Sequence, residues 1–285
     1  ATKYCDCKDH GMLLEAMLKA AGIDSTPVLI EANAAFELPK AASPFNFNHM
    51  ITYIPEFGLF ADSTARYASF GLLPDTDEGM PVVRVNSGEI VMTTRSSPDL
   101  DSMRVVQTIS LHDDGSAEGD TEVTSVGEEA MTMRALISAL PKGRDADFFR
   151  AFLGPSATGS IDRGDLETLK SDYSFKAHYS VTNYVNLPGP GALPVQLGFS
   201  PISFFGLIGS DLPQRRTHPY GCNSMNAEDD VTMAMPAGME IVSLPKDIDS
   251  EADGLRLQSK SEVLPGNKLH RHTVLRAVHD SEICD

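Results

Sequence analysis

The chain has 285 residues, enough for one large domain or two of ordinary size. It carries 23 Lys and Arg against 40 Asp and Glu, a formal net charge of −17, with no basic cluster beyond Arg215-Arg216. Nucleic acids and anionic membranes bind positive surfaces, so we expect neither as a partner. No apolar run approaches the ~20 residues that cross a bilayer, so the sequence predicts no transmembrane segment.

The first predicted element is an amphipathic helix over residues 7–21. Asp6 is a good N-cap, Asp9 follows as a capping-box partner, and Gly22 is placed to end the helix. Cys7 would stand in the first turn, where free backbone N–H groups and the helix dipole favour a thiolate. Cys7 is therefore a candidate nucleophile. The apolar side chains at helical spacing are Leu13, Leu14, Met17, Leu18 and Ala21.

Short strands follow the helix, first over residues 26–30 and then, after a polar loop, over 48–54 and 59–62. The last two are joined by the turn 55–58 and predict an antiparallel hairpin. This hairpin carries a histidine near its start and an aspartate at its end.

The side-chain parity of this hairpin decides whether the two polar residues can meet. If Ile54 pairs with Leu59, then Ile51 faces Asp62, and His49 lies on the same face two residues away. Such diagonal neighbours are ~7–8 Å apart at Cα, within reach of a His–Asp hydrogen bond. A one-residue slip would put them on opposite faces. His49 could instead be structural, and Asp62 could simply close the strand end by hydrogen bonding with the residues that follow it.

A polar stretch after residue 93 predicts a boundary between a first domain, 1–95, and a β-rich second domain, 96–285. Turn sequences at 113–115 and 265–267 predict hairpins between 105–112 and 117–125, and between 255–264 and 268–278. We expect a mainly antiparallel β-sandwich with a helical insertion. Its further predicted elements are strands at 179–187, 231–235 and 239–244 and helices at 127–140 and 145–153.

A cysteine, a histidine and an acid in this order are typical of thiol acyl-transfer chemistry. The thiolate attacks an acyl carbon, the histidine moves the proton, and the acid orients the imidazole. The backbone N–H of Cys7, at the helix start, can serve as one oxyanion donor.

The first 75 residues resemble the bacterial transglutaminase-like superfamily, which typically reads Gly-Asp-Cys-Lys-Asp, then a leucine-rich helix and Ala-Gly-Ile before a strand. Its further motifs are a Phe-Asn-His strand and a Leu-Asp-Pro-Thr strand end. The matching segments here are Asp6-Cys7-Lys8-Asp9, Leu13-Leu14, Ala21-Gly22-Ile23, Pro27-Val28-Leu29, Phe47-Asn48-His49-Met50-Ile51 and Phe60-Ala61-Asp62-Ser63-Thr64.

This resemblance implies an α+β fold, with a partial papain-like core followed by the β-rich domain. It assigns Cys7 as nucleophile, His49 as base and Asp62 as the orienting acid. The later part of the chain resembles the β-rich extensions of unknown function in bacterial envelope proteins, which implies a periplasmic or otherwise exported protein. The chain departs from the family at Cys5, where a glycine is usual, and at Ser63, where a proline is usual.

Family members carry helices and often a β domain before the nucleophile, and an aromatic oxyanion donor often comes from that part. This chain has only six residues before Cys7 and no Trp. We therefore expect an upstream segment of the same gene product to complete the fold.

The remaining cysteines and histidines leave alternatives open. Cys222 and Cys284 form either a disulfide, which would suit an exported protein, or two buried free thiols. Cys5 could form a strained disulfide with Cys7, or could join it and His10 in a metal cluster that matches no zinc spacing. His270 and His272 share a strand face that is either a metal site or an exposed polar surface. We expect no metal and no cofactor.

The sequence thus predicts attack of Cys7 on a peptide or glutamine amide, giving a thioester that water hydrolyses or an amine intercepts. A peptide or protein is the expected substrate, and hydrolysis, as in a peptidase or amidase, the expected outcome. Two alternatives are a non-catalytic binding or assembly module that retains the fold, and a structural envelope protein built around the β domain.

Overall fold

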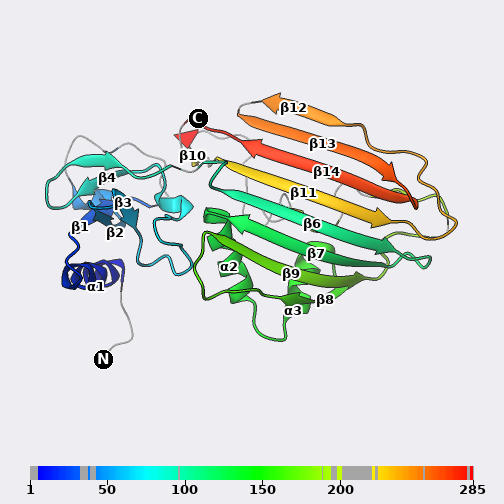
Figure 1. Cartoon of the computed structure of the whole chain (residues 1–285), viewed down its shortest axis with the longest axis horizontal. Helices are drawn as coiled ribbons and strands as arrows, with labels where there is room; N and C mark the ends of the chain where they lie inside the picture. Colours follow the sequence, from blue (N-terminus) through cyan, green and yellow to red (C-terminus); the bar gives the residue numbers. More distant parts are fainter. Residues whose placement is uncertain are drawn as a thin grey trace. The chain divides into compact units, whose positions relative to one another are not determined.

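Figure 1 shows the computed structural model of the chain. It describes residues 6–32, 38, 43–95, 97–187, 189–193, 198–200, 220–221, 224–252, 254–280 and 283–284. The chain divides into two compact units. The first unit comprises residues 1–100, 214–224 and 278–285, and the second comprises residues 101–213 and 225–277.

The first unit contains an antiparallel five-stranded sheet in the order β3-β2-β1-β4-β5, and one α-helix among its described residues. A separate two-stranded sheet pairs β10 with β15, from segments that the sequence assigned to the second domain. The elements are α1 Cys7–Ala20, β1 Thr26–Ile30, β2 His49–Ile54, β3 Leu59–Ala61, β4 Pro81–Arg84, β5 Ile90–Met92, β10 Tyr220–Gly221 and β15 Ile283–Cys284, with 3-10 helices at Pro44–Asn46 and Asp75–Asp77.

Helix α1 begins where its sequence predicts, because a capping box forms. The Asp6 carboxylate accepts hydrogen bonds from the backbone N–H groups of Lys8 and Asp9, and the Asp9 carboxylate accepts one from Asp6. The helix packs on the sheet through Gly11, its one buried residue. The apolar side chains of Leu13 and Met17 are 63% exposed, so the predicted apolar stripe does not coincide with the buried face.

The main core of the first unit lies on one face of the five-stranded sheet. Met50 and Thr52 on β2 face Gly11 of α1, whereas Ile51 between them faces the core. This alternation is the period of a β-strand. The core comprises Val28, Ile30, Ile51, Phe60, Leu73, Met80 and Val82.

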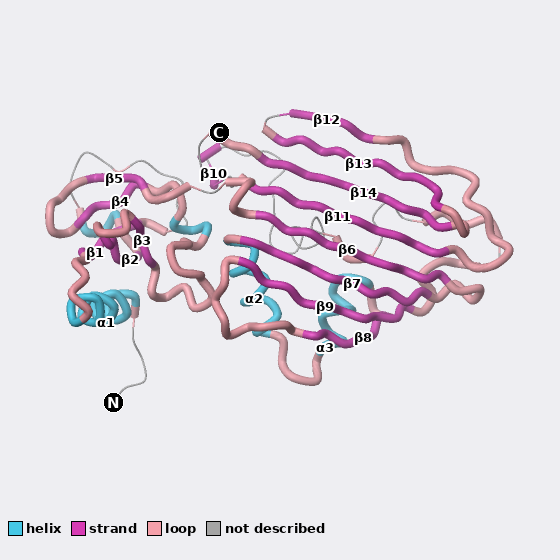
Figure 2. Tube along the Cα trace, in the orientation of Figure 1, coloured by secondary structure: helices cyan, strands magenta, loops and turns pink. Residues whose placement is uncertain are grey.

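The second unit is built on one eight-stranded sheet in the order β12-β13-β14-β11-β6-β7-β9-β8 (Figure 2). The pair β6–β11 is parallel and the other neighbours are antiparallel. The strands are β6 Ser102–Leu111, β7 Ala117–Val126, β8 Ala157–Asp162, β9 Asp172–Val181, β11 Met225–Ala234, β12 Ile248–Ala252, β13 Leu255–Leu264 and β14 Lys268–Ala277.

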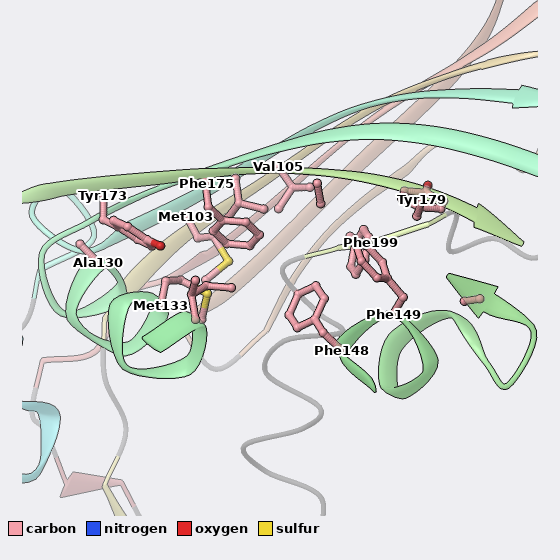
Figure 3. Close-up of a cluster of buried hydrophobic side chains, with 14 of the residues drawn as sticks. Met103, Val105, Ala130, Met133, Phe148, Phe149, Tyr173, Phe175, Tyr179 and Phe199 are labelled. Atoms are coloured by element: carbon pink, nitrogen blue, oxygen red, sulfur yellow. The ribbon is translucent and has the colours of Figure 1, made fainter. Parts of the chain in front are cut away.

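Two helices, α2 Glu128–Ala139 and α3 Asp145–Leu153, bring apolar side chains against one face of this sheet. Figure 3 shows Met133 of α2 near Met103 and Phe175, and Phe148 and Phe149 of α3 near Phe199. These side chains form the largest buried cluster of the second unit.

The structure corrects the predicted fold class. The described residues form fifteen strands and three α-helices, so the protein is mostly β rather than α+β with a partial papain-like core. A β-sandwich is also wrong for the second unit, whose long strands form a single sheet. The helices that follow β7 cover one part of the apolar face, and loop side chains such as Val185 and Leu187 pack on another part. The other face carries charged side chains such as Arg104, Glu122 and Lys176.

The two predicted hairpins of the second unit are confirmed, with β6 pairing β7 and β13 pairing β14. The strand predicted at 239–244 is wrong, because these residues form no strand. None of the described helices is long and apolar enough to span a bilayer.

Candidate active site

The thiol of Cys7 stands at the first residue of α1, half-buried and not engaged in a disulfide. The Asp6 cap uses the N–H groups of Lys8 and Asp9, and therefore leaves the Cys7 N–H to an incoming acceptor. An N–H at this position, aided by the helix dipole, can bind a developing oxyanion.

The side chains of His49 and Asp62 meet across the β2–β3 hairpin. Ile54 pairs with Leu59, which is the register that the parity argument requires. The distance from His49 Nε2 to Asp62 Oδ2 is 3.2 Å, and the two side chains are 16% and 5% exposed. Both groups are therefore held in a largely water-excluded pair.

The pKa of His49 is raised to about 9. The hydrogen bond and the negative charge of Asp62 outweigh the burial that would lower it, and a hydrogen bond with the Cys7 side chain raises it further. His49 is therefore an imidazolium at neutral pH. Because Nε2 faces Asp62, the other ring nitrogen, Nδ1, is not used by this pair.

Asp62, the residue directly after β3, is held in place by Thr64. Its Oδ1 accepts hydrogen bonds from the backbone N–H and the hydroxyl of Thr64, both at 2.8 Å. Burial would raise the pKa of Asp62, but the hydrogen bonds from His49 and Thr64 lower it overall. Asp62 thus both closes the strand end and engages His49, so the two interpretations of this residue are compatible.

Two contacts bring α1 to the hairpin. A Cβ on Gly11 would lie 2.7 Å from Cε of Met50, so the glycine allows the helix to approach β2 closely. The His10 ring lies with Nδ1 3.1 Å from the carbonyl oxygen of Ser63. The three predicted residues, Cys7, His49 and Asp62, are thereby brought together.

Sequence reasoning missed a fourth polar group at this site, Asp77, in the 3-10 helix Asp75–Asp77. Asp77 is 1% exposed, and its side chain, His49 and Asp62 each place one oxygen or nitrogen within 4.8 Å of the others. The pKa of Asp77 is raised to about 7 by burial and by the charge of Asp62. No spacing or motif in the sequence relates residue 77 to the other three.

The other polar clusters considered from the sequence fall into two groups. Cys7 is a free thiol, so the Cys5–Cys7 disulfide is not formed. Cys222 and the side chain of Cys284 lie outside the described residues, so that pair is not described. His270 and His272 lie against the carboxylates of Asp230 and Glu228 at 3.2 and 3.0 Å. Arg104 also contacts both carboxylates, so these charges already form an ion-pair network on the sheet.

No family model and no curated protein matches the chain. Among solved structures, the chain is similar to the crystal structure of a putative protease from Parabacteroides distasonis, with a TM-score of 0.44 and 12% sequence identity. The match covers 94% of this chain but only 37% of that chain.

Proposed function

We propose that this protein is a cysteine-dependent enzyme that cleaves peptide or glutamine amides through a thioester on Cys7. The observation that carries the proposal is the His49–Asp62 pair, at 3.2 Å and largely buried, with the Cys7 side chain near enough to the same imidazole to raise its pKa. A nucleophile, a base and an orienting acid are the three groups that such chemistry requires.

The reaction would begin with the Cys7 thiolate forming a bond to the amide carbon, while the carbonyl electrons move onto oxygen. The Cys7 N–H stabilises this oxyanion. When the oxyanion collapses, the C–N bond breaks, and the leaving nitrogen takes the proton of the His49 imidazolium. His49, now neutral, then removes a proton from water, which attacks the thioester carbon and releases the acid and the thiolate. An amine in place of water would give a cross-link.

The proposal also includes a family, a location and a partner segment, all of which rest on the sequence resemblance. Membership of the transglutaminase-like superfamily, on the motifs around Cys7, His49 and Asp62, agrees with the same chemistry. An exported location and an upstream segment of the same gene product that completes the first unit are proposed on the same resemblance.

A second candidate function is a non-catalytic binding or assembly module. It is favoured by the apolar side chains of Met12, Leu13 and Met17, which α1 exposes by 63% or more. Larger exposed apolar patches mark interaction surfaces. A Cys7→Ala variant that supports the cellular role of the protein as well as the wild type would leave only this function.

Alkylation by iodoacetamide, with the adduct located by mass spectrometry, tests the enzymatic proposal without a known substrate. Because the imidazolium persists up to pH 9, we expect rapid labelling of Cys7 with little change in rate between pH 6 and pH 8.5. The matched control is His49→Gln, in which Cys7 should label slowly at pH 6. A wild-type rate that rises about tenfold per pH unit over this range, or preferential labelling of Cys222 or Cys284, would overturn the proposal.

A further inference from the structure

We propose that Asp77 is a positioning residue of this site, whose neutral carboxyl group donates a hydrogen bond to Asp62 and holds that carboxylate toward His49. The inference deepens the proposed function and rests on it. It adds a fourth group to the three that the sequence suggests.

The location of Asp77 is fixed by its backbone. The hydroxyl of Thr93 donates a hydrogen bond to the carbonyl oxygen of Asp77, and the backbone N–H of Met80 donates to the same hydroxyl at 2.9 Å. Thr93 is itself buried. The 3-10 helix that ends at Asp77 is therefore anchored beside the five-stranded sheet, and the side chain is presented to the site independently of any bond that it makes there.

The surroundings of the carboxyl group favour its neutral form. Oδ1 accepts a hydrogen bond from the Thr76 hydroxyl at 3.3 Å, whereas Oδ2 is buried and has no donor in the described part of the chain. An ionised Asp77 would bury a charge with one oxygen lacking a donor and beside the charge of Asp62, and these costs outweigh the attraction of His49 and the bond from Thr76. Two adjacent carboxyl groups avoid this by sharing one proton, and the raised pKa of Asp77 agrees.

A neutral Asp77 has one O–H to donate, and Asp62 is the anionic acceptor near it. The oxygen atoms of Asp62 already receive hydrogen bonds from Thr64 and His49. A further charge-assisted bond from Asp77 would fix the carboxylate from its buried side. Because misplacement of about 1 Å in a catalytic group costs on the order of 100-fold in rate, a residue that only orients Asp62 has a measurable effect.

The experiment compares Asp77→Asn with Asp77→Ala, since the Asn amide keeps an N–H donor at every pH and alanine has none. The rate of Cys7 alkylation is measured from pH 5 to pH 9, and each variant's folding is checked by circular dichroism. We expect Asp77→Ala to slow Cys7 labelling at pH 6 by about tenfold or more. Asp77→Asn should stay within about threefold of the wild type at pH 6 and equal or exceed it at pH 8.5.

The matched control is Asp75→Ala, which changes an exposed carboxylate of the same 3-10 helix and should leave the rate unchanged. The inference is overturned if Asp77→Ala labels like the wild type, or if Asp77→Asn is slowed at pH 6 by tenfold or more. If Asp77→Ala does not fold, the Asn variant decides alone. A divalent cation that copurifies stoichiometrically and is lost in Asp77→Asn would also overturn it. Failure of the proposed function can be told apart from failure of this inference, because in that case Cys7 of the wild type would itself label slowly at pH 6.

Discussion

The two units use buried polar groups in different ways. The second unit is built on strands that are mostly ten residues long, and helices close its main core with aromatic side chains. The first unit has strands of two to six residues, and it buries Asp77 beside His49 and Asp62. Buried Gln107 of the second unit is hydrogen-bonded to Thr121 and to the backbone of Phe199, whereas one oxygen of buried Asp77 in the first unit has no donor among the described residues. A buried polar atom of this kind is expected where function rather than stability selects the residue.

The largest effect that would sharpen this comparison is expected for Asp62→Asn. The change removes the negative charge of Asp62 and leaves at most a neutral hydrogen bond to His49, so the pKa of His49 falls and the imidazolium is lost at neutral pH. We expect amide hydrolysis to fall by about 10³–10⁴-fold, and Cys7 alkylation at pH 6 by at least about tenfold. Kinetics of alkylation followed by mass spectrometry measure the second quantity. Asp24→Asn, at an exposed site of the same unit, is the control, and equal loss in both variants would contradict the role of Asp62.

Phe149→Ala tests the comparison from the other unit. Phe149 is fully buried in α3, with its ring 6.0 Å from that of Phe199. Truncation should lower the free energy of unfolding of the second unit by about 3–5 kcal/mol, because it leaves a cavity. Chemical denaturation measures this loss, with the partly exposed Leu169→Ala as control. The rate of Cys7 alkylation at pH 6 should stay within about twofold of the wild type. A fall in this rate that accompanies the loss of stability would show that the site in the first unit depends on the core of the second.

The smallest expected effect is a difference in pH dependence between the units. Burial raises the pKa of Asp229, in the second unit, to about 7, so the folded state retains a proton that the unfolded state loses above its ordinary value of 3.8. The free energy of unfolding of the second unit therefore decreases as the pH rises from about 4 to about 7. The contribution of His49 lies in another window, because its raised pKa stabilises the fold fully below pH 6.5 and this stabilisation is lost as the pH rises through 9.

Asp229→Asn should abolish this pH-dependent decrease. We expect the free energy of unfolding of the second unit to rise by on the order of 1–3 kcal/mol at pH 8 and to stay unchanged at pH 4. Hydrogen exchange from pH 4 to pH 9, read separately for peptides of each unit, measures this. Asp113→Asn, in an exposed hairpin turn, is the control. A gain at pH 8 spread over both units would contradict the assignment to Asp229.

The sequence predicts what depends on neighbours along the chain. The start of α1 follows from the side-chain chemistry of Asp6 and Asp9, and the approach of His49 to Asp62 follows from the parity of one short hairpin. Asp77 could not be found in this way, because a 3-10 helix and a bond to Thr93 bring it to the site. The single sheet of the second unit was also missed, since it depends on pairing between distant strands. The exposed Leu13 and Met17 show that an apolar stripe alone does not identify the face that packs.

The parallel pair β6–β11 bears on the order in which the chain folds. Ser102 lies opposite Asn226, so this pairing closes a loop of more than a hundred residues, whereas β6, β7 and β9 join through successive antiparallel pairs with the helices between them. Closing a long loop costs chain entropy before any contact repays it. We therefore expect β6 to β9 to assemble first during synthesis, with β11 and β14 adding later. Until then, the edge of β6 is an open template for pairing with other chains.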